Sequence, residues 1–222
     1  MSTKVIVSYD GTEADTDALA LGRLLAKAGA SLALAYVRHA PDARDEAETL
    51  LDEGAARLGD PDVVRHVVLS ASTPEGLREL AEREQVEVIA FGSEYRTTPG
   101  HVAPGTSAQR LLDGGPIAIG LAPAGLWERD GAPVTTIAAI AENGDPAPTE
   151  TAASLAAALG ATVVARADDD AGLVVVGSRP GTAAGRVTLS AAAAYLIEML
   201  RCPVLVLPHG TALRFDGTVP PS

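Results

Sequence analysis

The sequence predicts an α/β protein in which a parallel sheet carries helices on both faces, and in which this unit occurs twice. Three observations support the prediction. Short β-rich runs alternate with helical periodicity through the first half, which implies parallel strands joined by helical crossovers. Hydrophobic residues make up 47% of the chain and aromatic residues only 3%, as expected for aliphatic helices packed on a buried parallel sheet. A block near the middle of the chain also recurs near its end.

The first half contains five candidate strands separated by four candidate helices. In the helical segments apolar residues recur at steps of three and four, whereas the strands are short, continuous apolar runs. The expected strands are residues 5–7, 32–37, 63–69, 86–91 and 117–121. The expected helices are residues 14–28, 43–58, 73–84 and 106–112.

The recurring block indicates an internal duplication. Residues 92–123 and 177–208 align without a gap, so that residue n matches residue n + 85. Both blocks follow an apolar strand, and identities in such a matched context favour duplication over chance. The identical pairs include Gly92/Gly177, Ser93/Ser178, Gly100/Gly185, Val102/Val187, Ala108/Ala193, Leu111/Leu196 and Pro123/Pro208.

The duplication divides the chain into a first module and a smaller second module of the same type. The boundaries that we expect are a first module at 1–123, a linker at 124–133, a second module at 134–208 and a C-terminal tail at 209–222. In the linker, Trp127 is expected to be a packing anchor.

The second module lacks everything that matches residues 41–85. Its expected elements are a strand at 136–141, a helix at 149–159 and a strand at 162–165. A parallel crossover normally needs a dozen or more residues, and few remain before the next strand at 173. Either residues 166–172 cross the sheet nearly extended, or the second strand is absent or antiparallel.

A glycine-bounded loop after the fourth strand has the features of a phosphate site. Gly92 would let the backbone leave its strand close to a ligand, and Gly105 would let the chain enter a helix at an unusual dihedral angle. The N–H groups of Gly105, Thr106 and Ser107, with the helix dipole behind them, would bind an anion. Asp10 follows the first strand, at the sheet edge where ligands of open α/β sheets bind.

These residues resemble the signature of the ATP-binding universal stress proteins, G-x2-G-x9-G-[S/T] after the fourth strand and an Asp-Gly-Ser/Thr turn after the first. Here the signature reads Gly92, Tyr95 and Gly105-Thr106, with Asp10-Gly11-Thr12. Tyr95 replaces the second glycine, which puts backbone contact to a phosphate at that position in doubt. The resemblance covers nearly all of 1–123 and, in outline, 134–208.

The resemblance implies an open parallel sheet in the order 3-2-1-4-5 and a cytoplasmic nucleotide-binding protein with a regulatory role in stress. The ligand would be ATP, or ADP or AMP, with or without Mg²⁺. It would place adenine against Asp10 and Val37, ribose near Gly92, and the phosphates at Gly105, Thr106 and Ser107. Family dimers pair through their fifth strands, so residues 117–121 and 204–207 are expected side by side in an intramolecular pseudo-dimer.

The second copy of the loop has lost the signature. Pro180 stands in place of Tyr95, Ser190 in place of Gly105, and Ala191 in place of Thr106. Asn143 or Asp145 is expected where the first module has Asp10. We therefore expect one nucleotide per molecule, bound in the first module.

Charge and composition restrict the other partners. The formal net charge of −12 is spread along the chain, which disfavours nucleic acid and anionic membranes. No apolar run approaches the roughly 18 residues of a membrane span, and the N-terminal residues do not resemble a signal peptide. Cys202 is the only cysteine, so no intrachain disulfide is possible, and we expect it to be buried.

Two alternatives to nucleotide binding stay open. The first is a ligand-free interaction module that uses the fold only for assembly. The second is an enzyme, an ATPase or a nucleotidyl transferase, and it is the weaker one because Thr106 stands where a P-loop has its lysine; without that lysine the motif lacks its charge on the β- and γ-phosphates. At most slow hydrolysis is expected. Further self-association also stays open.

Overall fold

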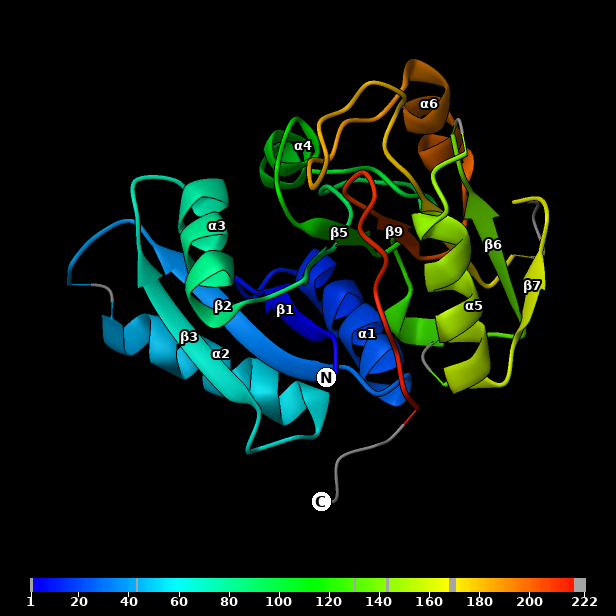
Figure 1. Cartoon of the computed structure of the whole chain (residues 1–222). Helices are drawn as coiled ribbons and strands as arrows, with labels where there is room; N and C mark the ends of the chain where they lie inside the picture. Colours follow the sequence, from blue (N-terminus) through cyan, green and yellow to red (C-terminus); the bar gives the residue numbers. More distant parts are fainter. Residues whose placement is uncertain (1, 43, 130, 143, 168–170, 218–222) are drawn as a thin grey trace.

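The computed structural model of the chain describes residues 2–42, 44–129, 131–142, 144–167 and 171–217. This part forms one sheet of nine strands with helices on both faces (Figure 1). The strands are β1 (Lys4–Ser8), β2 (Ser31–Arg38), β3 (Val64–Leu69), β4 (Val88–Phe91), β5 (Ala118–Leu121), β6 (Thr136–Ile140), β7 (Thr162–Val164), β8 (Leu173–Val176) and β9 (Val204–Val206). The helices are α1 (Glu13–Lys27), α2 (Arg44–Leu58), α3 (Thr73–Glu84), α4 (Thr106–Leu112), α5 (Ala147–Leu159) and α6 (Ala191–Met199), with a 3-10 turn at Trp127–Arg129.

The first half of the sheet has the order expected from the sequence. Its strands run β3-β2-β1-β4-β5, and every neighbouring pair is parallel. The prediction of an open parallel sheet in the order 3-2-1-4-5 is therefore confirmed. The expected element bounds differ from the structure by a few residues at most, except that Ala43, expected to begin α2, lies outside the described residues.

The second half repeats this order without a counterpart of β3. Its strands run β7-β6-β8-β9, all parallel. Strand β7 pairs with β6 as β2 pairs with β1, so the second strand is present and parallel. Strand β8 lies on the far side of β6 from β7, and the described residues of the connection, 165–167 and 171–172, form no helix.

The two halves share one continuous sheet because β5 and β9 pair antiparallel. Gly120 lies opposite Leu205 in the middle of this pair. The expected adjacency of the two final strands is thus confirmed. The pairing also satisfies the backbone groups of both edges, which would otherwise be open to other chains.

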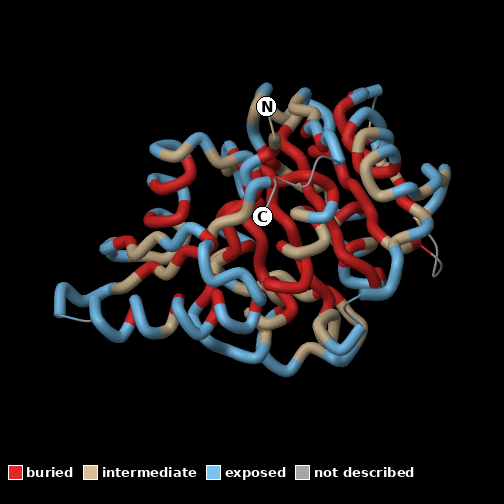
Figure 2. Tube along the Cα trace, turned by 90° about the horizontal axis from the view of Figure 1, so that it is seen from below, coloured by how far each residue is buried: buried red, intermediate tan, exposed pale blue. Residues whose placement is uncertain are grey.

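Two layers of helices cover the sheet. Helices α1, α2 and α5 pack their apolar side chains into one core, and α3, α4 and α6 into a second core on the opposite face. Successive strand residues alternate between the cores: Val5 and Val7 face the first, and Ile6 faces the second. Figure 2 shows buried strands through the centre of the molecule and exposed residues along the outer sides of the helices.

The duplicated blocks fold alike down to single hydrogen bonds. Ser93 is buried; its hydroxyl donates to the carbonyl of Ala122 (2.7 Å) and accepts the N–H of Ala103 (3.1 Å). The same bonds recur 85 residues later, where the hydroxyl of Ser178 donates to Leu207 (2.8 Å) and accepts from Thr188 (3.2 Å). A buried serine therefore fixes each loop to the strand that follows it.

The segment between the halves is anchored to α1. The carboxylate of Asp17 accepts the N–H groups of Gly125 (2.9 Å) and Trp127 (2.8 Å). The guanidinium of Arg23 lies 4.9 Å from the centre of the Trp127 ring. Burial raises the pKa of Asp17. Trp127 is thus a packing anchor, as expected.

The C-terminal segment crosses the molecule between α1 and α5 (red in Figure 1). Leu213 and Phe215 are 2% and 6% exposed, in the core of that face. The N–H of Leu213 donates to Thr151 on α5 (2.9 Å), and the N–H of Gly217 donates to the carbonyl of Ala28, just after α1 (3.1 Å). Residues 211–217 therefore tie the two halves together.

Candidate functional site

The structure brings Asp10, Val37 and Gly92 to the carboxyl edge of three neighbouring strands. Ser8, the last residue of β1, pairs with Ala35, so Asp10 and Val37 each come two residues after this pair. Strands β1 and β4 are also neighbours, and Gly92 directly follows β4. The three residues thus meet at the edge where open α/β sheets bind ligands.

Gly92 has a packing role that the sequence did not reveal. A Cβ at this position would lie 1.9 Å from the carbonyl oxygen of Ala14 in the first turn of α1. No side chain fits there, so glycine allows α1 to approach the end of β4. The corresponding Cβ at Gly177 would lie 2.7 Å from Cγ of Pro148.

Val37 offers little of its side chain to a ligand. It is 6% exposed and belongs to the core beneath α3. A Cβ at Gly76 of α3 would lie 2.9 Å from a methyl group of Val37, which shows how closely the helix packs on it. Any contact with adenine would therefore involve its backbone or the edge of the side chain.

Asp10 lies beside a second carboxyl group, that of Asp15, at the start of α1. The Oδ2 atom of Asp15 accepts the N–H groups of Asp10 (2.7 Å) and Thr12 (3.2 Å). Burial, together with a side-chain hydrogen bond to Asp10 and repulsion from its charge, raises the pKa of Asp15 to about 8. Asp15 therefore holds its proton far above the pH at which an exposed aspartate loses it.

The start of α4 presents donors, but its geometry corrects one expectation. Gly105 has φ −70° and ψ 171°, an extended conformation open to any residue, so the unusual dihedral angle expected there is wrong. Nothing lies within 4 Å of a Cβ built on Gly105. Thr106 is exposed and Ser107 half-buried. Ser93 and Pro104 form an antiparallel bridge, which directs the N–H of Gly105 toward the carbonyl of Gly92. Among the described residues, none accepts a hydrogen bond from the N–H groups of Thr106 or Ser107.

The second half closes the equivalent place with its own side chains. Val5 pairs with Val88 and Ile137 with Leu173, so Asp10, five residues after Val5, corresponds to Glu142. The hydroxyl of Ser190, which corresponds to Gly105, donates to the carboxylate of Glu142 at 2.6 Å.

The same hydroxyl of Ser190 accepts the N–H of Ala193 and caps α6. Ser190 has φ −73° and ψ 160°, so it shares the backbone conformation of Gly105. The two positions differ in their side chain and not in their fold.

The expected counterpart of Asp10 in the second half was wrong. The strand register assigns Glu142 to this place; Asn143 lies outside the described residues. Asp145 is buried and has another task, since its carboxylate accepts the N–H groups of Ala147 and Gly210, both at 3.0 Å. It therefore fixes the start of α5 to the beginning of the C-terminal segment.

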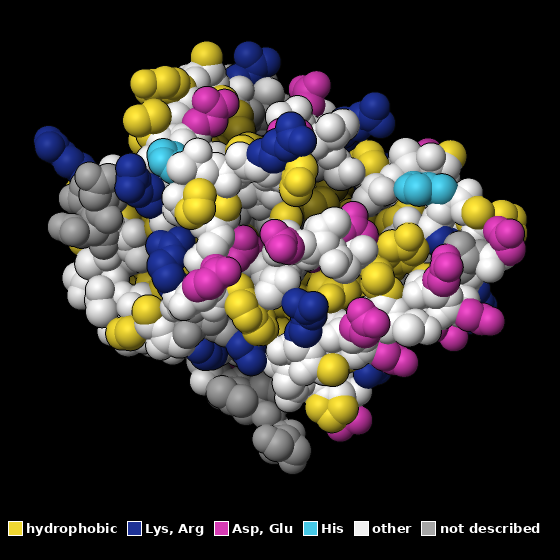
Figure 3. Space-filling model, turned by 180° about the vertical axis from the view of Figure 1, so that it is seen from behind, with side chains coloured by type: hydrophobic (Ala, Val, Ile, Leu, Met, Phe, Trp, Pro, Cys, Tyr) yellow, Lys and Arg dark blue, Asp and Glu magenta, His cyan; other side chains and the backbone are white. Residues whose placement is uncertain are grey.

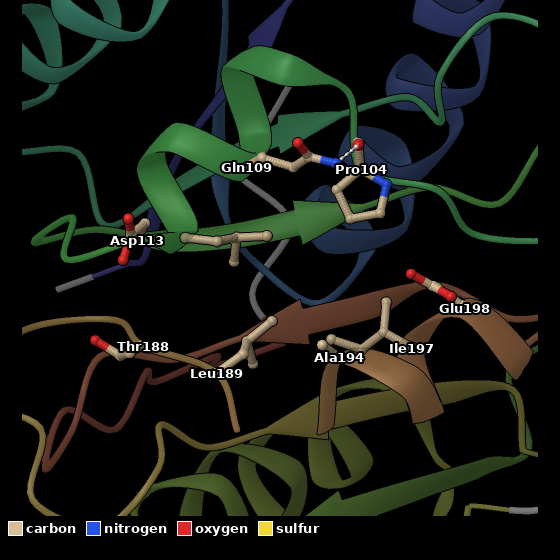
Figure 4. Close-up of a pocket in the computed structure, with 9 residues that line it drawn as sticks. Pro104, Gln109, Asp113, Thr188, Leu189, Ala194, Ile197 and Glu198 are labelled. Carbon is tan, nitrogen blue, oxygen red and sulfur yellow. Dashed lines mark hydrogen bonds between the residues drawn. The ribbon is translucent and has the colours of Figure 1, made fainter. Parts of the chain in front are cut away.

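A cavity of about 260 Å³ lies between the halves, where α4 faces α6 (Figure 4). The residues that line it are related by the duplication: Pro104/Leu189, Gln109/Ala194, Leu112/Ile197 and Asp113/Glu198. In Figure 4, Asp113 and Glu198 lie at opposite ends, and Gln109 donates to the carbonyl of Pro104 (2.9 Å). The cavity thus marks the approximate two-fold relation between the halves and does not include Gly105.

The surface fits the charge balance of the sequence. Figure 3 shows acidic side chains scattered over one face with Lys and Arg side chains between them. Cys202 is buried, as expected, and burial raises the pKa of its thiol to about 12. No helix of the described residues is long and apolar enough to cross a membrane.

No protein-family model matches the sequence, and no curated protein matches it. Solved structures do match. A protein of unknown function from Pseudomonas aeruginosa is 14% identical, with a TM-score of 0.64, and the match covers 94% of this chain and 93% of that one. A second Pseudomonas aeruginosa protein, assigned to the universal stress proteins, is 14% identical with a TM-score of 0.63 and 94% of each chain covered. A universal stress protein from Archaeoglobus fulgidus is 14% identical with a TM-score of 0.56, covering 94% of this chain and 99% of that one. Over nearly its whole length, this chain has the fold of the universal stress proteins.

Proposed function

We propose that this protein binds one adenine nucleotide in its first half and acts as a cytoplasmic regulatory protein of the universal stress type. The observation that carries the proposal is the difference between Gly105 and Ser190. In the second half the hydroxyl of Ser190 fills the space before the helix and is bonded to Glu142. In the first half nothing lies within 4 Å of a Cβ built on Gly105, and the N–H groups of Thr106 and Ser107 have no acceptor among the described residues.

The donors of this space suit phosphate groups. The N–H groups and the hydroxyls of Thr106 and Ser107 belong to the first turn of α4. Hydrogen bonds from such donors to an anion are charge-assisted and stronger than neutral ones. Asp10, on the neighbouring strand end, is an acceptor for the amino group of adenine. Among the described residues no group of three or more His, Cys, Asp or Glu could hold a metal, so Mg²⁺ would enter on the phosphates.

Closing the first site with the side chains of the second tests the proposal. In the Asp10→Glu/Gly105→Ser variant, the pair found at Glu142 and Ser190 is rebuilt in the first half. Titration calorimetry should show about one ATP per wild-type molecule and no heat for this variant. The matched control is Ser190→Gly, which opens the second half and should leave ATP affinity in the first half unchanged.

Thr106→Ala provides a graded version of the test. Loss of one charge-assisted hydrogen bond costs about 1.5–3 kcal/mol, or roughly ten- to a hundred-fold in affinity. Wild-type stoichiometry near two, or ATP binding that survives Asp10→Glu/Gly105→Ser, would contradict the proposal. A melting temperature that does not rise with ATP, ADP or AMP would favour the ligand-free interaction module, because a ligand of the folded state must stabilise it.

A further inference from the structure

A second cavity, of about 370 Å³, lies where the first half meets a loop of the second. Its walls come from the first two turns of α3, from the end of α4 and from Arg186 in the loop before α6. Its volume falls within the roughly 300–1,000 Å³ of small-molecule sites. None of the residues expected to bind the nucleotide lines it.

Three arginines meet in this cavity: Arg78 from α3, Arg110 from α4 and Arg186 from the second half. Within the described part of the chain, none of the three guanidinium groups forms an ion pair. Arg186 only donates a hydrogen bond to the carbonyl of Gly114 (3.3 Å). By contrast Arg44, Arg65, Arg83 and Arg214 each lie within 4.0 Å of a carboxylate.

The side chains that line the cavity have a net positive charge, whereas the whole chain has a net negative one. Its lining holds the three arginines against Glu75 and Asp113, a net charge of +1. The whole chain has a net charge of −12. The three guanidinium groups have no carboxylate within 4.0 Å in the described part of the chain, so they are available to an anion that enters the cavity.

The arginines are peculiar to this side of the molecule. In the duplicated blocks, Tyr195 corresponds to Arg110 and His101 corresponds to Arg186. The second half has no counterpart of α3, and so none of Arg78. The cluster therefore occurs once per chain, and it needs both halves because Arg186 reaches it from the second.

We propose that this cavity is a second anion site and that its ligand is a phosphorylated small molecule. Guanidinium groups bind phosphate through paired hydrogen bonds in a fixed geometry. The oxygens of a phosphate group can accept hydrogen bonds from several directions. This suits three arginines that come from separate segments of the chain. Ser72, which precedes α3, adds a hydroxyl that forms no side-chain cap to the helix. The site is distinct from the one proposed around Gly105.

Inorganic phosphate, pyrophosphate and glycerol phosphate are the probes for this site. Titrations at constant ionic strength, with chloride as the reference salt and malonate as a dicarboxylate, separate phosphate binding from general screening. They are best made on Asp10→Glu/Gly105→Ser, in which the nucleotide site is closed, so that each proposal can fail without the other. Binding of at least one phosphate probe to this variant, tighter than malonate, is expected.

Two variants take the residue of the duplicated counterpart and so disturb the fold little: Arg110→Tyr and Arg186→His. Each should weaken phosphate binding about tenfold, since each removes a charge-assisted bond. Arg83→Gln changes the same charge on α3 outside the cavity and should have no effect. Absence of binding by every phosphate probe, equal binding of malonate, or equal weakening by Arg83→Gln would overturn the proposal.

Discussion

The loop at 92–105 and its copy at 177–190 have the same backbone and different tasks. Each is held by a buried serine through the same hydrogen bonds, to Ala122 and Ala103 in one and to Leu207 and Thr188 in the other. They differ at the last residue of the loop. The hydroxyl of Ser190 is bonded to Glu142, whereas Gly105 has no side chain and nothing lies within 4 Å of a Cβ built on it. The comparison shows that the same loop backbone can be kept in both copies while one side chain fills the space before the helix in only one of them.

The largest loss of stability is expected at the first glycine of the loop, because Gly92 and Gly177 pack against different atoms. Gly92→Ala drives a Cβ into the backbone carbonyl of Ala14, at 1.9 Å, so α1 must move away from β4. Gly177→Ala meets only a proline ring atom, at 2.7 Å. We expect a loss of at least about 3 kcal/mol for the first and less for the second, measured by urea denaturation. Equal losses would mean that the helix contact is not what selects glycine in the first half.

A smaller effect, alike in both halves, is expected for the buried serines. Ser93→Ala and Ser178→Ala each remove the partner of a buried carbonyl and of a half-buried N–H. The cost should be about 2 kcal/mol in each case, again from urea denaturation. Only Ser93→Ala should also weaken ATP binding, because only its loop carries the proposed site. If Ser178→Ala weakens ATP binding as much, the assignment of the site to the first half is wrong.

A third comparison concerns Gly105 and Ser190, the residues that end the two loops. Ser190→Ala removes a helix cap and the bond to Glu142, and should cost about 1 kcal/mol. Gly105→Ser places a serine on a backbone that already suits it. It should change the free energy of unfolding by no more than a few tenths of a kcal/mol. A strongly destabilised Gly105→Ser protein would show that the site cannot accept a side chain at all.

A further effect, a gradual pH dependence of stability, belongs to the first half. The pKa of Asp15 in the folded protein, about 8, lies above its ordinary value of 3.8, so the folded state holds this proton more tightly than the unfolded one. Its contribution to stability is complete below about pH 4 and is lost as the pH rises toward 8. Asp15→Asn should flatten the pH dependence of the melting temperature over this interval. An unchanged profile would contradict the raised pKa of Asp15.

The sequence predicted the order and type of the elements better than the contacts between side chains of different elements. The alternation of strands and helices and the duplication follow from residues close together in the chain, such as the ungapped block that begins at Gly92, and the strand order followed from the family resemblance. The partnership of Glu142 and Ser190 could not be seen, because the strand that precedes Glu142 shares too few residues with β1 to fix its register. The packing role of Gly92 depends on the distance between a strand and a helix, which spacing does not give. Gly105 was misjudged since glycine is compatible with ordinary dihedral angles as well as unusual ones.

The sequence alone also could not show that the C-terminal segment packs between the two halves. The apolar residues Leu213 and Phe215 were the available signal, and they occupy buried positions between α1 and α5. Two isolated apolar residues in a segment rich in loop-forming neighbours do not specify a partner. Only the placement of α1 beside α5 creates the groove that they fill.

Residues 211–217 also set an order of events during synthesis. They close against α1 and α5, yet the ribosome releases them long after Ala28 and well after Thr151. At about 5–20 residues per second, the first half has several seconds in which its sheet forms while the groove beside α1 is still uncovered. Burial of this groove therefore waits until residues 211–217 have been made, and a chain stalled before residue 213 would leave the groove between α1 and α5 uncovered.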